Sequence, residues 1–137
     1  MALWLFKEEP THYSYDDLVK DGSTLWNGIE NALARKHLRQ VKKGDRIFYY
    51  HTGKEKAVVA EMKALEDAKQ DPESDDENAV AVKVGPVKRL TAPVQLSRIK
   101  ADSAFAEWEL VRMSRLSVMP VSPEIWKRIE AMSREKA

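Results

Sequence analysis

Short runs of apolar and aromatic residues alternate with polar, glycine and proline positions along the chain. Their content of Val, Ile, Phe and Tyr and their turn-forming boundaries favour β-strands. We predict strands at residues 2–7, 45–53, 56–68, 79–90 and 114–121. Lys54 and Glu55 separate the second run from the third, so these two runs are expected to pair as a hairpin. Gly85 and Pro86 predict a bulge or bend in the fourth run.

Capping residues indicate where helices begin and end. Ser14 is a suitable N-cap, Asp17 completes a capping box, and Gly22 ends the short first helix. A second helix is expected at residues 31–41, and a short helix or turn after Pro93. The last helix is expected at residues 122–136, where Ser122 is the N-cap and Pro123 occupies the first helical position. The last helix has a periodic stripe that predicts its buried side: Ile125, Trp126, Ile129 and Met132.

This order of elements favours an α+β fold over a doubly wound parallel sheet. The strands are short, interrupted and mostly hairpin-like, which is typical of a curved, partly closed sheet that is mostly antiparallel. We expect five to six strands with peripheral helices. The 137 residues suit one domain and are too few for two ordinary ones, so residues 1–137 are interpreted as a single domain.

Side chains alternate between the two faces of a strand, which restricts the possible sites. Glu8 and Glu9 therefore point to opposite faces and are not a catalytic pair. Of Tyr49 and Tyr50, one is expected in the core and the other at a ligand or solvent. In the last predicted strand, one face carries Leu116 and Val118, and the other carries Arg115, Ser117 and Met119.

The net charge is only +1, which argues against a protein that holds long DNA by phosphate neutralisation alone. The charges are nevertheless segregated. Basic residues gather at 35–46 and acidic residues at 66–77, either as two solvated surfaces or with the basic segment as a phosphate track.

Several classes of protein are disfavoured. The sequence has no cysteine, which removes disulfides and thiolate chemistry. No apolar run approaches the roughly 18–20 residues of a membrane helix, and residues 1–7 do not read as a signal peptide. We therefore expect a cytoplasmic protein that is monomeric by default and does not bind membranes.

The common catalytic and cofactor motifs are missing from the sequence. It contains no G-x-G-x-x-G, P-loop or G-x-S-x-G motif, and His12, His37 and His51 lack the spacing of metal ligands. We expect no metal and no cofactor, and hydrolysis stays a weak alternative. Trp26 precedes an Asn-Gly turn signal and does not belong to a helical stripe. It is either a core residue or a surface on which a planar base stacks, and such stacking contributes about 1–3 kcal/mol.

Five ordered motifs resemble one known family. They are WLFKEEP at 4–10, YSYDDL at 13–18, LWNGIENALARKHLR at 25–39, GDRIFYYHTG at 44–53 and LVRMSRLSVMPVSPEIW at 110–126. On these motifs the chain resembles the EVE domain family, within the PUA-like group that also includes YTH and ASCH domains. The resemblance implies a PUA-like β pseudo-barrel with helices packed around it.

The resemblance also implies a function and a site. It suggests a non-catalytic module that accepts a modified base, with methylated or hydroxymethylated cytosine in DNA as the candidate and DNA favoured over RNA. Trp26 would stack, Asn31 and Ser117 would read base edges, and the cations would meet phosphate. The residues carried over by motif are Lys7, Glu8, Trp26, Asn31, Tyr50, His51, Thr52, Arg112, Arg115 and Ser117.

This chain departs from the family pattern at three positions of the presumed rim. Glu30 stands where arginine is usual and would repel phosphate, Leu33 stands where an aromatic-glutamine pair begins, and Met113 replaces a frequent glutamine. Two alternatives therefore stay open. One is a small enzyme or small-molecule binder for modified nucleobases or nucleosides, and the other is a protein-interaction module with an unused pocket.

Overall fold

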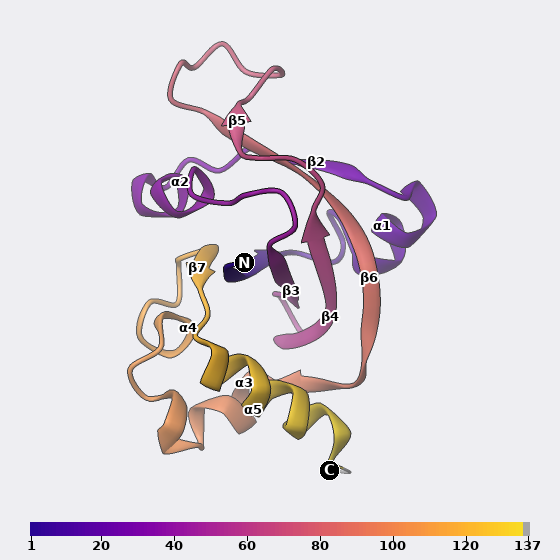
Figure 1. Cartoon of the computed structure of the whole chain (residues 1–137). Coiled ribbons are helices and arrows are strands. Elements are labelled where there is room, and N and C mark those ends of the chain that lie inside the picture. The colour runs from indigo at the N-terminus through magenta and orange to yellow at the C-terminus, as the bar shows by residue number, and fades with distance from the viewer. Residues whose placement is uncertain (136–137) are drawn as a thin grey trace.

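A strongly curled mixed sheet dominates the computed structural model, which describes residues 1–135 (Figure 1). Its strands are β1 Leu3–Glu8, β2 Thr24–Trp26, β3 Arg46–His51, β4 Ala57–Ala64, β5 Lys69–Gln70, β6 Val80–Gln95 and β7 Val118–Pro120. The order across the sheet is β2-β6-β4-β3-β1-β7, and β5 pairs with β6 beside this path. β1 and β3 are parallel, and the remaining pairs of described strands are antiparallel.

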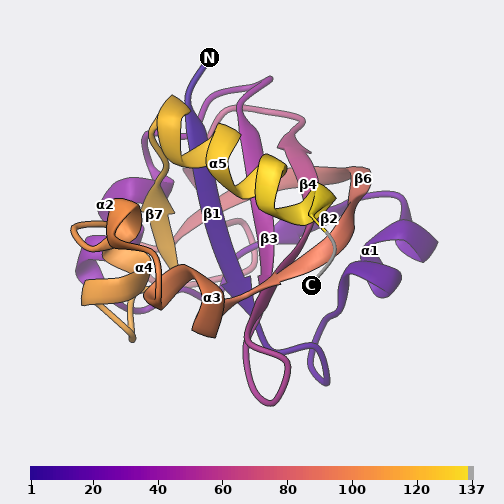
Figure 2. The same ribbon diagram turned by 90° about the horizontal axis from the view of Figure 1, so that it is seen from below.

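Helices lie around this sheet. They are α1 Tyr15–Asp21, α2 Ala32–Leu38, α3 Leu96–Lys100, α4 Glu109–Arg112 and α5 Pro123–Arg134, with a 3-10 turn at Ser103–Phe105. In Figure 2, α5 crosses one face of β1 and β3, whereas α1 and α2 lie at opposite sides of the sheet. The predicted α+β fold, with a curved and mostly antiparallel sheet and peripheral helices, is confirmed, although the described residues form seven strands instead of the expected five to six.

The curl follows from irregular pairing along the two longest strands. β4 and β6 change register twice, and one shift lies where Met62 pairs with Pro86. Proline cannot donate to the ladder, and a bulge increases the local twist. The bend predicted at Gly85 and Pro86 is thus confirmed, but the strand runs on to Gln95, beyond the expected end at residue 90.

Local signals place most helix ends correctly. Ser14 and Asp17 form the predicted capping box, and Gly22 ends α1 with φ +79°. The second helix is shorter than expected, because Asn31 is its N-cap and it ends at Leu38 instead of residue 41. The last helix begins at Pro123 as predicted and ends at Arg134; residue 136 of the expected range lies outside the described residues.

Two expectations about the site-bearing strands are wrong. The Asn-Gly turn signal suggested that Trp26 is held on a turn, but Trp26 ends strand β2, where it pairs with Val82. The last strand contains only Val118–Pro120, so Arg115 lies in the preceding turn. Met119, which was expected on the same face as Arg115, is fully buried. The turn leaves Arg115 exposed while Leu116 anchors the segment in the core.

The inner face of the sheet is packed with aromatic rings. The Trp26 ring lies 5.5 Å from that of Phe6 and 5.3 Å from that of Tyr49, which also meets Tyr15 edge-on. On the outer face, the ring of Phe48 in β3 stacks on that of Trp126 in α5 at 3.6 Å. Each such pair adds about 0.5–1.5 kcal/mol to the effect of burial.

Asp45 joins the start of β1 to the turn before β3. Its carboxylate accepts hydrogen bonds from the Trp4 indole N–H at 2.9 Å and from the backbone N–H groups of Ala2 and Lys42, at 3.0 and 2.9 Å. Asp45 is 3% exposed, so its carboxylate has little access to water and depends on these donors. This buried carboxylate therefore fixes where the parallel β1–β3 pair begins.

Replacing Asp45 tests this anchor. Asp45→Ala strands three donors and is expected to lower the free energy of unfolding by about 3 kcal/mol, measured by urea denaturation. Asp45→Asn keeps one acceptor oxygen and should lie between wild type and Asp45→Ala. Asp75→Ala, at an exposed loop position, should change stability by less than about 0.5 kcal/mol. If Asp45→Ala is as stable as Asp75→Ala, the anchor is refuted.

Candidate functional site

The residues predicted for the site do not converge on one cavity. Lys7 and Glu8 are neighbours in β1 and point to opposite faces of the sheet, as strand alternation requires. Each lines a different cleft, so the end of β1 separates two distinct sites.

The first site, which we name the β2 cleft, opens at the ends of β1 and β2. It has a volume of about 300 Å³, at the lower end of the range for small-ligand sites. Of the predicted residues it brings together Glu8 and Trp26. Its lining is Glu8, His12, Tyr13, Thr24, Leu25, Trp26, Asn27 and Glu73.

Carboxylates and their hydrogen bonds dominate the chemistry of the β2 cleft. A Glu8 oxygen lies 3.3 Å from Nδ1 of His12. The Asn27 side-chain amide donates to Glu73 at 2.7 Å and to Asp71 at 3.2 Å. These bonds tie the loop between β5 and β6, residues 71–79, which we name the acidic loop, to β2. The β2 cleft therefore presents oxygen acceptors to any ligand.

A phenol and an indole complete the β2 cleft. Burial and a hydrogen bond to Asp21 raise the pKa of Tyr13 to about 12, so its hydroxyl keeps its proton at neutral pH. Trp26 is only 5% exposed, because its ring packs between Phe6 and Tyr49. Stacking of a base on Trp26 stays a prediction, since the indole also belongs to the core.

The second site, which we name the lysine cleft, lies where α3 and α4 meet the outer face of the sheet. Its volume is about 200 Å³, and it brings together the predicted residues Lys7, Tyr50 and Thr52. Burial raises the pKa of Tyr50 to about 12. Tyr49 is fully buried in the core, whereas Tyr50, although only 3% exposed, lines this cleft, which agrees with the expectation that one of the two reaches a ligand site. The lining is Lys7, Tyr50, Thr52, Gly53, Lys56, Leu96, Lys100, Leu110 and Ser114.

His51 makes structural contacts in both directions. Its Nε2 accepts the backbone N–H of Tyr15 at 3.1 Å, so Nδ1 carries the proton and donates to Glu55 at 2.7 Å. The first N–H groups of a helix have no partner within it. His51 thus supplies an acceptor at the start of α1.

The other predicted residues lie apart from both clefts. Asn31 uses its side-chain oxygen to cap α2, accepting the N–H of Ala34 at 2.9 Å. Arg112 in α4 and Arg115 in the following turn are exposed, and the Ser117 carbonyl accepts the backbone N–H of Lys7. Their direct contact with a base stays a prediction.

Sequence reasoning missed several lining residues because long-range contacts bring them in. In the sequence, Asn27 was recognised only as part of a turn signal and not as a site residue. Glu73 reaches β2 through the loop after β5, and Lys56 and Lys100 come from a hairpin and from a helix. No local pattern in the sequence reports these meetings.

Ion pairs neutralise part of the basic segment. Arg35 pairs with Asp76 at 3.0 Å, and Arg46 makes two hydrogen bonds to the buried Glu61. Arg39 donates to the carbonyl of Asn78. The bonds of Arg35 and Arg39 hold the segment between β5 and β6, which projects at the top of Figure 1, against α2, whereas those of Arg46 join β3 to β4. As a result, the three arginines are partly committed to the fold.

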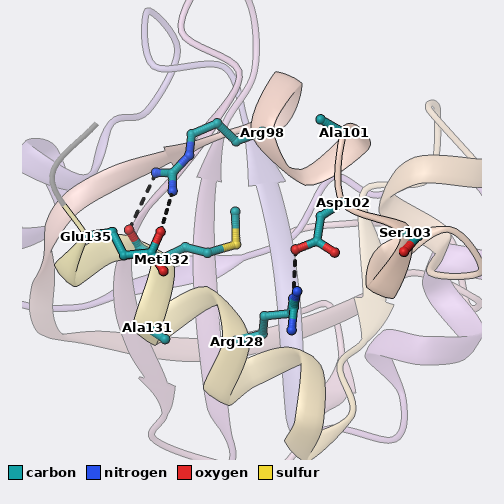
Figure 3. Close-up of a pocket in the computed structure, with 8 residues that line it drawn as sticks. All are labelled: Arg98, Ala101, Asp102, Ser103, Arg128, Ala131, Met132 and Glu135. Carbon is teal, nitrogen blue, oxygen red and sulfur yellow. Dashed lines mark hydrogen bonds and ion pairs between the residues drawn. The ribbon is translucent and has the colours of Figure 1, made fainter.

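The largest of the described clefts, about 660 Å³, lies between α3 and α5 (Figure 3). Its two arginines both have acidic partners. Arg98 contacts Glu135 at 3.2 Å, and Arg128 contacts Asp102 at 2.8 Å. This pairing makes the cleft a weak candidate for an anion.

The described part of the chain lacks two further features. Residues 1–135 contain no group of three His, Asp or Glu side chains arranged to hold a metal ion. Among the same residues, no helix combines the length and the apolar character needed to cross a membrane.

Comparisons with known proteins agree on one family. The EVE domain model matches residues 2–132. Chicken thymocyte nuclear protein 1 is 28% identical, over 97% of this chain and 69% of its own length. The structure of Rpa0253 from Rhodopseudomonas palustris is 36% identical, with a TM-score of 0.92, and covers 99% of this chain and 97% of that one.

A third relative was solved with a ligand. It is the human THYN1 protein in complex with 5-methylcytosine-containing DNA, which superimposes with a TM-score of 0.91 over all of both chains. At 24% identity, this likeness establishes the shared fold.

The structural role of His51 can be tested directly. His51→Ala leaves the buried N–H of Tyr15 without its acceptor and is expected to lower the free energy of unfolding by about 2 kcal/mol. Native-state hydrogen exchange at the Tyr15 amide should accelerate. His12→Ala is the control, because the His12 side chain is 78% exposed and should matter little to stability. Unchanged exchange at Tyr15 in His51→Ala would refute the role.

Proposed function

Because the chain belongs to the EVE domain family, we propose that it is a nucleic-acid-binding module whose β2 cleft receives a methylated or hydroxymethylated cytosine. It binds the base without changing it, and DNA is the expected partner in preference to RNA. The human THYN1 protein, which has the same fold and was solved with 5-methylcytosine-containing DNA, supports the proposal.

The observation that carries the proposal is the pair of carboxylates, Glu8 and Glu73, in a cleft of about 300 Å³ beside Trp26. Cytosine presents an exocyclic amino group, which donates hydrogen bonds and is recognised by acidic side chains. Thymine presents a carbonyl oxygen at the same position. Carboxylates therefore favour 5-methylcytosine over thymine, although both bases carry the same 5-methyl group.

A base enters such a cleft only when it has left the stack. In a duplex this means flipping the nucleotide outward, at a cost of a few kcal/mol, whereas a single strand avoids most of that cost. We therefore expect tighter binding to single-stranded DNA, or to duplex in which the target base is mismatched, than to a fully paired duplex.

The charge distribution implies few phosphate contacts. The net charge is +1, and Arg35 and Arg46 already have acidic partners. Affinity for DNA falls with salt in proportion to the number of phosphates that the protein neutralises. The module should thus bind with modest affinity and a shallow salt dependence, so that the base contributes much of the specificity.

Glu73→Gln tests the reading of the base. Single-stranded oligonucleotides that differ only in 5-methylcytosine or thymine at one position are compared by fluorescence anisotropy. Wild type should prefer 5-methylcytosine, and Glu73→Gln should reduce this preference about tenfold, the equivalent of one lost base-edge contact. Glu77→Gln is the matched control, because it removes the same charge from the same loop at an exposed position outside the β2 cleft.

Two outcomes would contradict the proposal. One is equal binding of the two oligonucleotides by wild type, and the other is an equal loss of preference in both variants. Mass spectrometry of the 5-methylcytosine oligonucleotide after incubation should find the base unchanged. A released or deaminated base would instead establish an enzyme that acts in this cleft.

A further inference from the structure

The lysine cleft concentrates positive charge without an acidic residue in its lining. Three lysines from different elements line it: Lys7 from β1, Lys56 from the β3–β4 turn and Lys100 from the end of α3. Burial and the charge of Lys100 lower the pKa of Lys7 from its ordinary value. The carboxylate of Glu9 lies beside Gly53 at one border, where it accepts a hydrogen bond from the Thr11 hydroxyl.

The position of Lys7 is well defined. Its Nζ donates to the carbonyl of Ser114 at 3.0 Å and lies 5.6 Å from the centre of the Tyr50 ring. An ammonium group has three N–H donors, so further donors remain after the bond to Ser114. Half-burial strengthens the attraction between this amine and any anion that enters the cleft.

Lys56 has an unusual backbone for its residue type. Its φ is +47°, in the left-handed region that glycine and asparagine tolerate best. Its carbonyl accepts the backbone N–H of Leu96 at 2.8 Å, which fixes this conformation against the start of α3. A lysine in a strained turn that lines a cleft is the kind of outlier that indicates a function.

Hydroxyl groups add neutral donors to the three amines. Tyr50 lines the cleft, and its raised pKa of about 12 keeps the phenol protonated, so that it donates to an anion instead of repelling it. Thr52 lines the same wall. Several donors around a small volume suit a tetrahedral oxyanion better than a planar carboxylate, because its oxygens point in more directions.

We propose that the lysine cleft binds a phosphate group through Lys7, Lys56 and Lys100. The site is distinct from the β2 cleft and goes beyond the proposed base binding. The phosphate belongs either to a nucleic-acid backbone or to a small phosphorylated molecule, and the chemistry of the cleft is the same for both.

Lys56→Gly is the decisive variant, because it removes one amine and also relieves the left-handed strain. The probe is inorganic phosphate, followed by NMR shifts of the Thr52 and Gly53 amides. Affinity should fall about tenfold, the typical effect of one charge-assisted hydrogen bond, while the melting temperature stays equal or rises. Loss of folding therefore cannot imitate loss of binding.

Lys54→Gly provides the matched control. Lys54 lies in the same turn and is exposed, but it does not line the cleft. The phosphate affinity of Lys54→Gly should stay within about twofold of wild type, since a surface charge outside a site contributes little. The proposal is overturned if wild type shows no saturable phosphate binding at these amides, or if both variants weaken it equally.

An oligonucleotide arm distinguishes the two sources of phosphate. If a backbone phosphate occupies the site, Lys56→Gly also weakens binding of single-stranded oligo(dT) and lowers its salt slope by about one phosphate contact. If only inorganic phosphate binding changes, the natural ligand is a small phosphorylated molecule. In both cases Lys56→Gly leaves the 5-methylcytosine preference intact, so failure of this site and failure of the β2 cleft give different results.

Discussion

The alternation of side chains along β1 is the constraint on which both clefts depend. Phe6 and Glu8 face the interior of the curled sheet, and Lys7 faces the outer side. The parallel register with β3 then pairs Lys7 with Tyr50 and Glu8 with His51. A shift by one residue would reverse every one of these assignments, which makes the Asp45 anchor at the start of the pair important for function as well as stability.

Hydrogen bonds of interior polar side chains position the walls of the clefts. His51 holds the start of α1, which follows the segment carrying His12 and Tyr13. Asn27 holds Glu73 in the acidic loop close to β2. Because these side chains are already hydrogen-bonded, the groups that remain to meet a ligand are carboxylate oxygens on one side and lysine amines on the other.

The fold could largely be predicted from the sequence, whereas the site could not. Capping residues and the Gly85 and Pro86 bend are local signals, and the structure agrees with them, whereas the alternation expected over residues 114–121 failed because the strand there is short. The order of the five motifs was sufficient to predict the family, which the family model confirms. The site needed the long-range pairing of β1 with β3 and the return of the acidic loop, which no local pattern reports. The family motifs therefore grouped Lys7 with Glu8 in one site, although their side chains point to opposite faces of β1 and line different clefts.

The two clefts have opposite charge, which matches the polarity of a nucleotide. The exocyclic amino group of cytosine donates hydrogen bonds and suits a carboxylate, whereas a phosphate is an acceptor and suits lysines. A protein of net charge +1 cannot gain this selectivity from its overall field, since that field is weak. Selectivity must therefore come from local groups, and the sheet between the clefts prevents their opposite charges from neutralising each other.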